Sequence, residues 1–149
     1  GLARIGLGFV VASNIGTDLD FSVSSNSTYN DLKNTSSTSS DENYLSQNSR
    51  LKLYWNIYAG IIVQGELNHR YDGGLSDDYE PNSYLLNASL GKKLFSNDSG
   101  ELRFTIYDIL NQNTNVTRTT TESYTEDSNT NVLGRYFLVS FIYNISPFK

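Results

Sequence analysis

Residues 50–67 have the sequence RLKLYWNIYAGIIVQGEL, and this stretch decides the fold. In its first part every second residue is apolar, namely Leu51, Leu53 and Trp55. After a turn signal at 57–60, a second alternating stretch begins at Ile61. A period of two residues is typical of a β-strand with one apolar and one polar face. The stretch therefore predicts two antiparallel strands joined by a short turn.

The same two-residue period continues on both sides of this hairpin. It predicts seven strands, near residues 3–11, 19–23, 50–55, 61–70, 86–94, 102–106 and 137–145. Their connections alternate between short turns, near 14–17, 57–60 and 96–100, and longer polar loops, at 31–43, 72–81 and 111–131. Short connections at one end and long ones at the other are typical of a membrane β-barrel. The sequence therefore predicts an all-β fold, an antiparallel transmembrane β-barrel to which the chain contributes about seven strands.

The composition excludes several classes of protein. The absence of Cys excludes disulfide bonds, Cys-ligated metals and thiol chemistry. A net charge of −5 argues against nucleic-acid binding, which needs a basic surface. No transmembrane helix is expected, because the chain has no apolar run of about 18 residues. Ser, Thr and Asn make up about a third of the 149 residues, which favours strands and turns over helices.

The chain contains no Met and begins at Gly1, which indicates a processed or excised piece of a longer protein. Seven is also an odd number of strands, whereas bacterial single-chain barrels have an even number. We therefore expect residues 1–149 to be one partial barrel domain, made of its C-terminal strands, with the earlier strands absent.

A soluble β-sandwich or barrel would also alternate apolar and polar residues. Two features favour the membrane interpretation. First, the opposite face carries large charged side chains, as a water-filled lumen allows. Second, aromatic residues of the apolar face lie near the predicted strand ends, where membrane barrels carry aromatic girdles. The girdle candidates are Tyr44, Tyr71 and Tyr84 at the loop end, Trp55, Tyr58 and Phe95 at the turn end, and Phe137, Phe141 and Tyr143 of the last strand.

The charged residues of the polar face form a second candidate site. The lumen-facing candidates are Arg4, Arg50, Lys52, Glu66, Arg70, Lys93 and Arg103, with Asp20 on the same face. Cations dominate this set, whereas the long loops are mostly acidic. We hypothesise that this basic wall faces acidic groups inside the barrel or an anionic solute. The alternative is that the cations pair with groups inside the barrel and on neighbouring strands and recognise no ligand, because interior charges are routine in such barrels.

No catalytic or metal-binding constellation is predicted. Residues 72–78, DGGLSDD, lack the ligand spacing and the terminal Glu of a calcium loop. His69 is the single histidine, and its parity places it on the apolar face near the loop end. Neither a Cys nor a G-x-S-x-G motif accompanies it, so nucleophilic and zinc chemistry have no basis. We therefore expect no enzyme activity, no metal and no cofactor.

The C-terminal third carries a resemblance to a known family. Residues 101–113, ELRFTIYDILNQN, resemble a segment of TonB-dependent-receptor-like outer-membrane barrels. Residues 116–118, 124, 126–127 and 131–137 look like the final hairpin of that family, and 141–144 looks like its closing strand. Earlier matches are residues 71–77 and 87–93. The chain is thus similar to the C-terminal part of this family of outer-membrane β-barrel proteins.

The resemblance implies a barrel of about 22 strands that holds an N-terminal plug and is energised through TonB. It also implies a multi-pass protein of the bacterial outer membrane, with a periplasmic C-terminus and external long loops. The expected partners are the remaining strands and plug of the same barrel, outer-membrane lipid and lipopolysaccharide, the TonB system if a plug exists, and outer-membrane lipoproteins or other complex partners. No nucleic acid is expected.

Three functions are compatible with this pattern. The first is solute uptake, in which the chain supplies barrel wall and external loops of a transporter. The second is a structural or partner-binding outer-membrane barrel that moves no solute. The third is a soluble β-sheet binding module. An upstream plug domain would favour solute uptake, and its absence would favour the structural or partner-binding barrel. Solubility of the chain as a monodisperse monomer without detergent would favour the soluble binding module.

Overall fold

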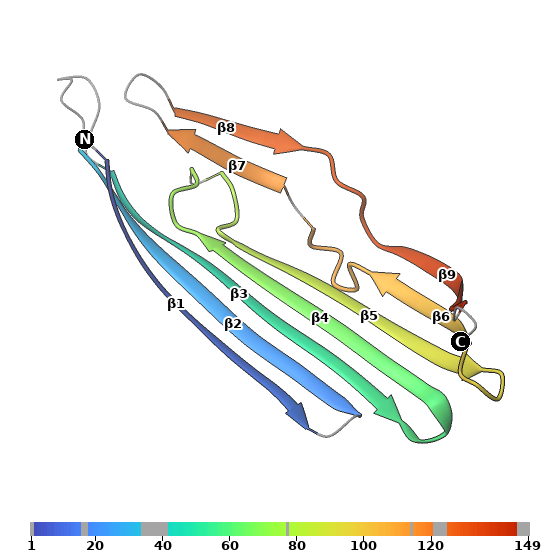
Figure 1. Cartoon of the computed structure of the whole chain (residues 1–149). Coiled ribbons are helices and arrows are strands. Elements are labelled where there is room, and N and C mark those ends of the chain that lie inside the picture. The colour runs from blue at the N-terminus through green and yellow to red at the C-terminus, as the bar shows by residue number, and fades with distance from the viewer. Residues whose placement is uncertain are drawn as a thin grey trace.

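The computed structural model describes residues 2–15, 18–33, 42–76, 78–113, 115–120 and 125–145. Over these residues the fold is all-β, and seven strands form one open antiparallel sheet in the order β1-β2-β3-β4-β5-β6-β9 (Figure 1). The strands are β1 (Leu2–Ile15), β2 (Leu19–Leu32), β3 (Glu42–Ile57), β4 (Ile61–Asp72), β5 (Asn82–Leu94), β6 (Gly100–Tyr107) and β9 (Tyr136–Tyr143). All seven predicted strands are confirmed, each paired with its neighbour in the predicted order.

The connections divide the sheet into a turn end and a loop end. The turns after β1, β3 and β5 lie at one end of the strands, and the loops after β2 and β4 lie at the other (Figure 1). The strands are longer than predicted, because β2 continues to Leu32 and β3 begins at Glu42. Main-chain pairing between β2 and β3 extends through Ser- and Asn-rich residues that show no apolar alternation. The predicted loop at 31–43 is correspondingly shorter.

Two of the turns contain residues with a positive φ. The β3–β4 turn contains the 3-10 helix η1 (Tyr58–Gly60), in which Ala59 and Gly60 have φ values of 62° and 71°. A Cβ at Gly60 would lie 3.0 Å from the Cβ of Lys93, so glycine is required here both for its conformation and for the space it leaves. The β5–β6 turn similarly places Phe95 and Asp98 at positive φ.

The connection at 111–131, predicted to be a loop, contains a hairpin. Strands β7 (Asn115–Thr120) and β8 (Thr125–Thr130) pair as a separate two-stranded sheet beyond the ends of β6 and β9 (Figure 1). Apolar periodicity could not reveal these strands, because they consist mainly of Thr, Asn and charged residues. The repeated Thr residues were the available signal, since β-branched side chains favour strands.

The described residues form almost no apolar core. Ile62, at 3% exposure, is the one buried hydrophobic residue among them. By contrast, many large apolar side chains are exposed, for example Leu7 at 82% and Phe9 at 57%. No helix in the described part of the chain is long and apolar enough to span a membrane. The sheet therefore leaves its apolar side chains in contact with the surroundings.

Candidate functional site

Strand parity and register divide the side chains of the sheet into two faces. One register row crosses all seven strands through Ser13, Phe21, Leu53, Gly65, Ala88, Ile106 and Phe137. Because alternate residues of a strand point to opposite sides, this row and every second row from it make up one face. We call it the apolar face, since it carries most of the exposed aliphatic and aromatic residues, and we call the other one the polar face.

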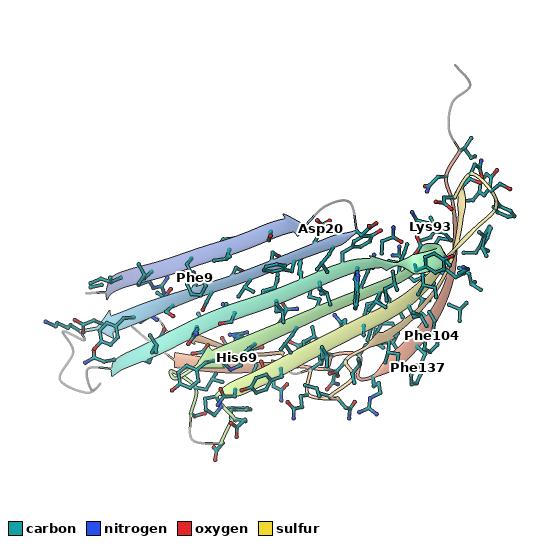
Figure 2. The ribbon with its side chains drawn as sticks, turned by 90° about the horizontal axis from the view of Figure 1, so that it is seen from below. Phe9, Asp20, His69, Lys93, Phe104 and Phe137 are labelled. Atoms are coloured by element: carbon teal, nitrogen blue, oxygen red, sulfur yellow. The ribbon has the colours of Figure 1, made fainter. Side chains whose placement is uncertain are left out.

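The polar face brings together all of the predicted lumen-facing residues. They occupy alternate register positions on β1, β3, β4, β5 and β6. The residues are Arg4, Arg50, Lys52, Glu66, Arg70, Lys93 and Arg103. Asp20 shares this face on β2. Figure 2 shows Asp20 and Lys93 toward the turn end and His69 toward the loop end. The shared face is confirmed, and a lumen on that side stays a prediction.

Glu66 is the centre of a charged network on this face. Its carboxylate lies 3.6 Å from Arg50 Nε and 3.9 Å from Lys52 Nζ. Asn68 extends the network, because its side-chain oxygen accepts from Arg50 Nε at 2.6 Å and its amide donates to Glu66 at 2.9 Å. Two cations of neighbouring β3 therefore share one carboxylate of β4.

Three of the other cations also have acidic partners on or near their own strands. Arg103 Nε donates to Glu101 at 2.7 Å on β6. Arg70 pairs with Asp72 at 3.1 Å on β4, and Lys93 lies 3.6 Å from Asp98 of the adjoining turn. The predicted basic wall is thus locally neutralised, which favours the alternative interpretation. The sequence analysis missed Glu101 and Asp72 as partners because the predicted strands, 102–106 and 61–70, ended just short of them, although each acid lies two residues from its partner and therefore on the same face.

Two hollows of similar size lie along the polar face. One, of about 720 Å³, is lined by residues that include Asp20, Lys52, Tyr54, Glu66, Asn87 and Arg103. The other, of about 710 Å³, lies nearer the loop end and is lined by residues that include Asn48, Arg50, Asn68, Arg70, Gln112 and Asn113. The sheet is therefore hollowed on the side that carries the charges, amides and hydroxyl groups.

Most of the aromatic candidates lie on the apolar face or in the turns beside it. The residues on this face are Trp55, Tyr71, Tyr84, Phe137, Phe141 and Tyr143. Phe137 stacks on Phe104 at 6.0 Å between ring centroids (Figure 2). Tyr58 and Phe95 are exposed in the β3–β4 and β5–β6 turns, and the Phe95 ring meets Tyr143 edge-on at 6.0 Å. A girdle role for these residues stays a prediction.

Tyr44 is the exception. It was predicted to lie on the apolar face, and that prediction is wrong. It pairs with Asn30, so its parity is that of Arg50 and Lys52 on the polar face. The β3 register runs without a bulge from Trp55 back to Tyr44, and the odd separation of these residues places them on opposite faces. The ring packs over Gly74, where an added Cβ would come within 2.7 Å of it. Tyr44 also lines a hollow of about 250 Å³ with Arg4 and Asn30.

The loop-end half of the apolar face contains hydrogen-bonded polar residues. Ser25 and Ser49 are joined through their hydroxyl oxygens at 2.8 Å, and Gln47 donates to both, at 3.1 and 3.2 Å. His69 lies on this face, as predicted, stacked on Tyr84 at 4.5 Å and bonded through Nε2 to the Asn82 side chain at 3.0 Å. These polar groups satisfy one another, which reduces the penalty for placing them on an apolar surface.

The apolar residues form a band that crosses the register diagonally. On β1 the band, Ile5–Val11, lies on the loop side of the common row and is centred five residues from Ser13. On β9 the band, Phe137–Tyr143, extends to the turn side and is centred three residues from Phe137. The band therefore shifts by eight residues over six strand-to-strand steps.

Asp108 anchors the segment that follows β6. It is 2% exposed and has φ 51°, and its carboxylate accepts the main-chain N–H groups of Gln112 at 3.0 Å and Asn113 at 3.2 Å. The Asn87 side chain accepts from the Asp108 N–H at 3.0 Å. Asn111 accepts from the Arg135 N–H at 3.2 Å, which ties both ends of the β7–β8 connection together. The stretch that carries the family resemblance thus has a local structural role.

Comparison of the chain with protein-family models, with curated proteins and with solved structures finds no match in any of the three. The resemblance to TonB-dependent-receptor-like barrels therefore stays a prediction. Within the described residues, no group of three or more His, Asp or Glu side chains is arranged to hold a metal ion. In the segment 72–78, the Asp72 carboxylate accepts hydrogen bonds from the Arg70 guanidinium and from the Gly74 N–H. Asp77 lies outside the described residues.

Proposed function

We propose that this chain is part of the wall of an outer-membrane β-barrel of the TonB-dependent-receptor type and functions in solute uptake. The observation that carries the proposal is the exposed apolar face of a sheet with almost no core. A soluble domain rarely exposes an apolar patch larger than a few hundred Å², because such a surface aggregates in water. Hydrocarbon around the apolar face would remove that penalty.

The diagonal course of the apolar band supports the same proposal. A bilayer is flat, so a band that follows it crosses the register obliquely when the strands are tilted. With about 3.4 Å per residue and about 4.8 Å between strands, the observed shift corresponds to a tilt of about 40°. Strands of membrane barrels are tilted by roughly 35–45°.

The polar face provides the water-filled side of the proposed wall. Its cations are neutralised by Glu66, Glu101 and neighbouring acids, so the wall carries polarity without a strong field of one sign. This feature favours passage or retention of a neutral solute over selection of an anion. It equally suits the second candidate function, a structural or partner-binding barrel, in which the charges only keep the lumen wet.

Trp55 offers a direct test, because it is the single tryptophan and is 46% exposed on the apolar face. The intact protein, with any further tryptophan replaced by Phe, is folded into phospholipid vesicles, and its fluorescence is measured with brominated acyl chains and with aqueous iodide. The proposal expects strong quenching by the brominated chains and little by iodide. The opposite pattern, or a monodisperse chain that stays soluble without detergent or lipid, would refute the membrane placement.

A matched control moves the probe by one residue. In the double variant Tyr54→Trp, Trp55→Phe, the indole lies on the polar face beside Lys52 and Gln64. Iodide should now quench the fluorescence and brominated chains should not. Equal quenching of both indoles by either agent would mean that the two faces meet the same environment.

Uptake is tested separately in the intact protein. Charge reversal by Arg50→Glu with Lys52→Glu places three carboxylates together with Glu66, which disrupts the network between β3 and β4. If the barrel transports, solute uptake or retention of a plug should change while membrane insertion remains. Unchanged uptake and plug retention would mean that Arg50 and Lys52 recognise no ligand, whereas an intact protein that takes up no solute would favour the structural barrel.

A further inference from the structure

The loop-end half of β5 has an open edge. Pairing between β5 and β6 begins at Ala88 and runs to the turn end, because β6 ends at Tyr107. Figure 1 shows β5 continuing well past the end of β6. The residues of β5 before Ala88 pair with β4 on one side, and on the other side no strand of the described chain pairs with them.

The hydrogen bonds identify which residues of this edge are free. Successive residues of a strand direct their main-chain groups alternately to its two sides. Pro81 O accepts from Asp72 N on the β4 side, whereas Leu86 O accepts from Ile109 N on the other side. The N–H and C=O groups of Asn82 and Tyr84 therefore point away from β4. Within the described chain, no main-chain hydrogen bond occupies them.

Asn82 and Tyr84 are among the residues that line a cleft of about 700 Å³. Its walls are Tyr79 and Glu80 of the β4–β5 loop, Gln112 and Asn113 of the segment held by Asp108, and the end of the β7–β8 hairpin with residues 129–132. The side chains are mainly carboxamides and phenols, with Val116 and Val132 as apolar elements. Among the described residues of the lining, Glu80 is the one that carries a charge.

We propose that this cleft binds an extended peptide segment of another chain, which adds as a strand to β5 at Asn82–Tyr84. An open edge of this kind presents a main-chain N–H and C=O at every second residue, the pattern that a peptide backbone completes. Carboxamide side chains around it both donate and accept, as peptide groups do. Glu80 selects against an acidic segment, so the partner is neutral or basic.

The cleft volume limits the partner to a short segment. A cavity of about 700 Å³ is within the range of small binding sites, roughly 300–1,000 Å³, and holds a few extended residues rather than a folded domain. Binding would extend the sheet on the external side of the proposed barrel. The proposal does not depend on the membrane placement, since edge pairing requires only β5 and the surrounding loops.

The test uses the full chain folded in a sugar-free detergent and a fluorophore-labelled acetyl-TVTVTK-amide peptide. Fluorescence anisotropy should show saturable binding, and N-methylation of every peptide amide should weaken it by about tenfold or more, because the donors for strand pairing are lost. Hydrogen exchange of the Asn82 and Tyr84 amides should slow on binding, while Ser83 and Leu85, which face β4, should not change.

Blocking the cleft supplies the control. Because the chain contains no Cys, Asn131→Cys gives a single attachment site for a bulky maleimide at the cleft wall, and Asn97→Cys gives a matched site at the turn end. Modification at 131 should abolish peptide binding and modification at 97 should not. Equal binding of the N-methylated peptide, no saturation up to about 1 mM, indifference to the 131 adduct, or displacement by maltohexaose would each overturn the proposal.

Discussion

At the scale of single residues, the charged network on the polar face consists of weak interactions. Glu66 and its two cationic partners are each between a third and three fifths exposed, so water and salt screen their attraction. The arrangement therefore keeps the face polar and fixes local rotamers more than it stabilises the sheet.

Replacing Glu66 with Gln tests this interpretation. The variant keeps the acceptor oxygen for Asn68 but removes the charge. We expect a loss of about 0.2–1 kcal/mol in the free energy of unfolding at low ionic strength, falling toward zero at high salt. Denaturant unfolding of the folded chain at two salt concentrations measures both values. A loss that is large and independent of salt would mean that Glu66 has a packing role.

Gly91 has a different importance, because it leaves room for an ion pair. An added Cβ would lie 2.7 Å from Glu101 Oε1, the oxygen that accepts from Arg103. Because this oxygen is the far end of a flexible side chain, Gly91→Ala should move Glu101 aside and cost only about 0.2–1 kcal/mol, through loss of the ion pair with Arg103. Gly65→Ala on the opposite face is the matched control, since nothing lies within 4 Å of its added Cβ. Denaturation midpoints should fall for the first variant and stay level or rise for the second.

At the scale of elements, the β7–β8 hairpin is held to the sheet through the segment that follows β6. The Asp108 carboxylate satisfies two consecutive N–H groups, and the positive φ of Asp108 turns the chain away from β5. Asp tolerates this conformation better than most residues because its short side chain bonds locally. The hairpin therefore has a defined base although it pairs with no strand of the main sheet.

Asp108→Ala should loosen this base. It leaves the Gln112 and Asn113 N–H groups without their acceptor, at a local cost of roughly 1–3 kcal/mol. Faster proteolysis within residues 115–130 and faster amide exchange at 112 and 113 are the expected results. Asp108→Asn retains one acceptor oxygen and should fall between wild type and Ala. An Ala variant with unchanged exchange would show that other contacts hold the hairpin.

The sequence predicted elements well where apolar residues alternate and poorly elsewhere. The strand order and the face on which most side chains lie could be predicted from the two-residue period. A strand with one apolar face carries an apolar residue at every second position. The face on which Tyr44 lies was predicted wrongly, because the Ser- and Asn-rich start of β3 shows no apolar alternation from which it could be read. Apolar periodicity gave no sign of the β7–β8 hairpin for the same reason. The acids Glu101 and Asp72 were missed because they lie just outside the predicted strand bounds, although each is two residues from its partner on the same strand.

At the scale of the whole molecule, the two faces should respond differently to the same substitution. Leu53 lies on the apolar face at the common row, and Gln64 lies on the polar face of the neighbouring strand. In vesicles, Leu53→Arg should cost about 2–4 kcal/mol, as for Arg in the middle of a bilayer, whereas Gln64→Arg should cost much less. Equilibrium unfolding in lipid measures both. Similar costs in the two variants would argue that neither face meets hydrocarbon.

The sequential strand order also affects how the sheet is assembled. Each strand pairs with the one that precedes it, and the long detour through β7 and β8 interrupts this order just once, between β6 and β9. Contacts between near neighbours in sequence form with little loss of chain entropy. Growth can thus proceed one hairpin at a time from β1 to β6, whereas docking of β9 must await the closure of a connection of 28 residues (108–135). Arg135 Nε donates to Asp108 O at 3.4 Å across that connection, which holds it closed once the last strand has docked.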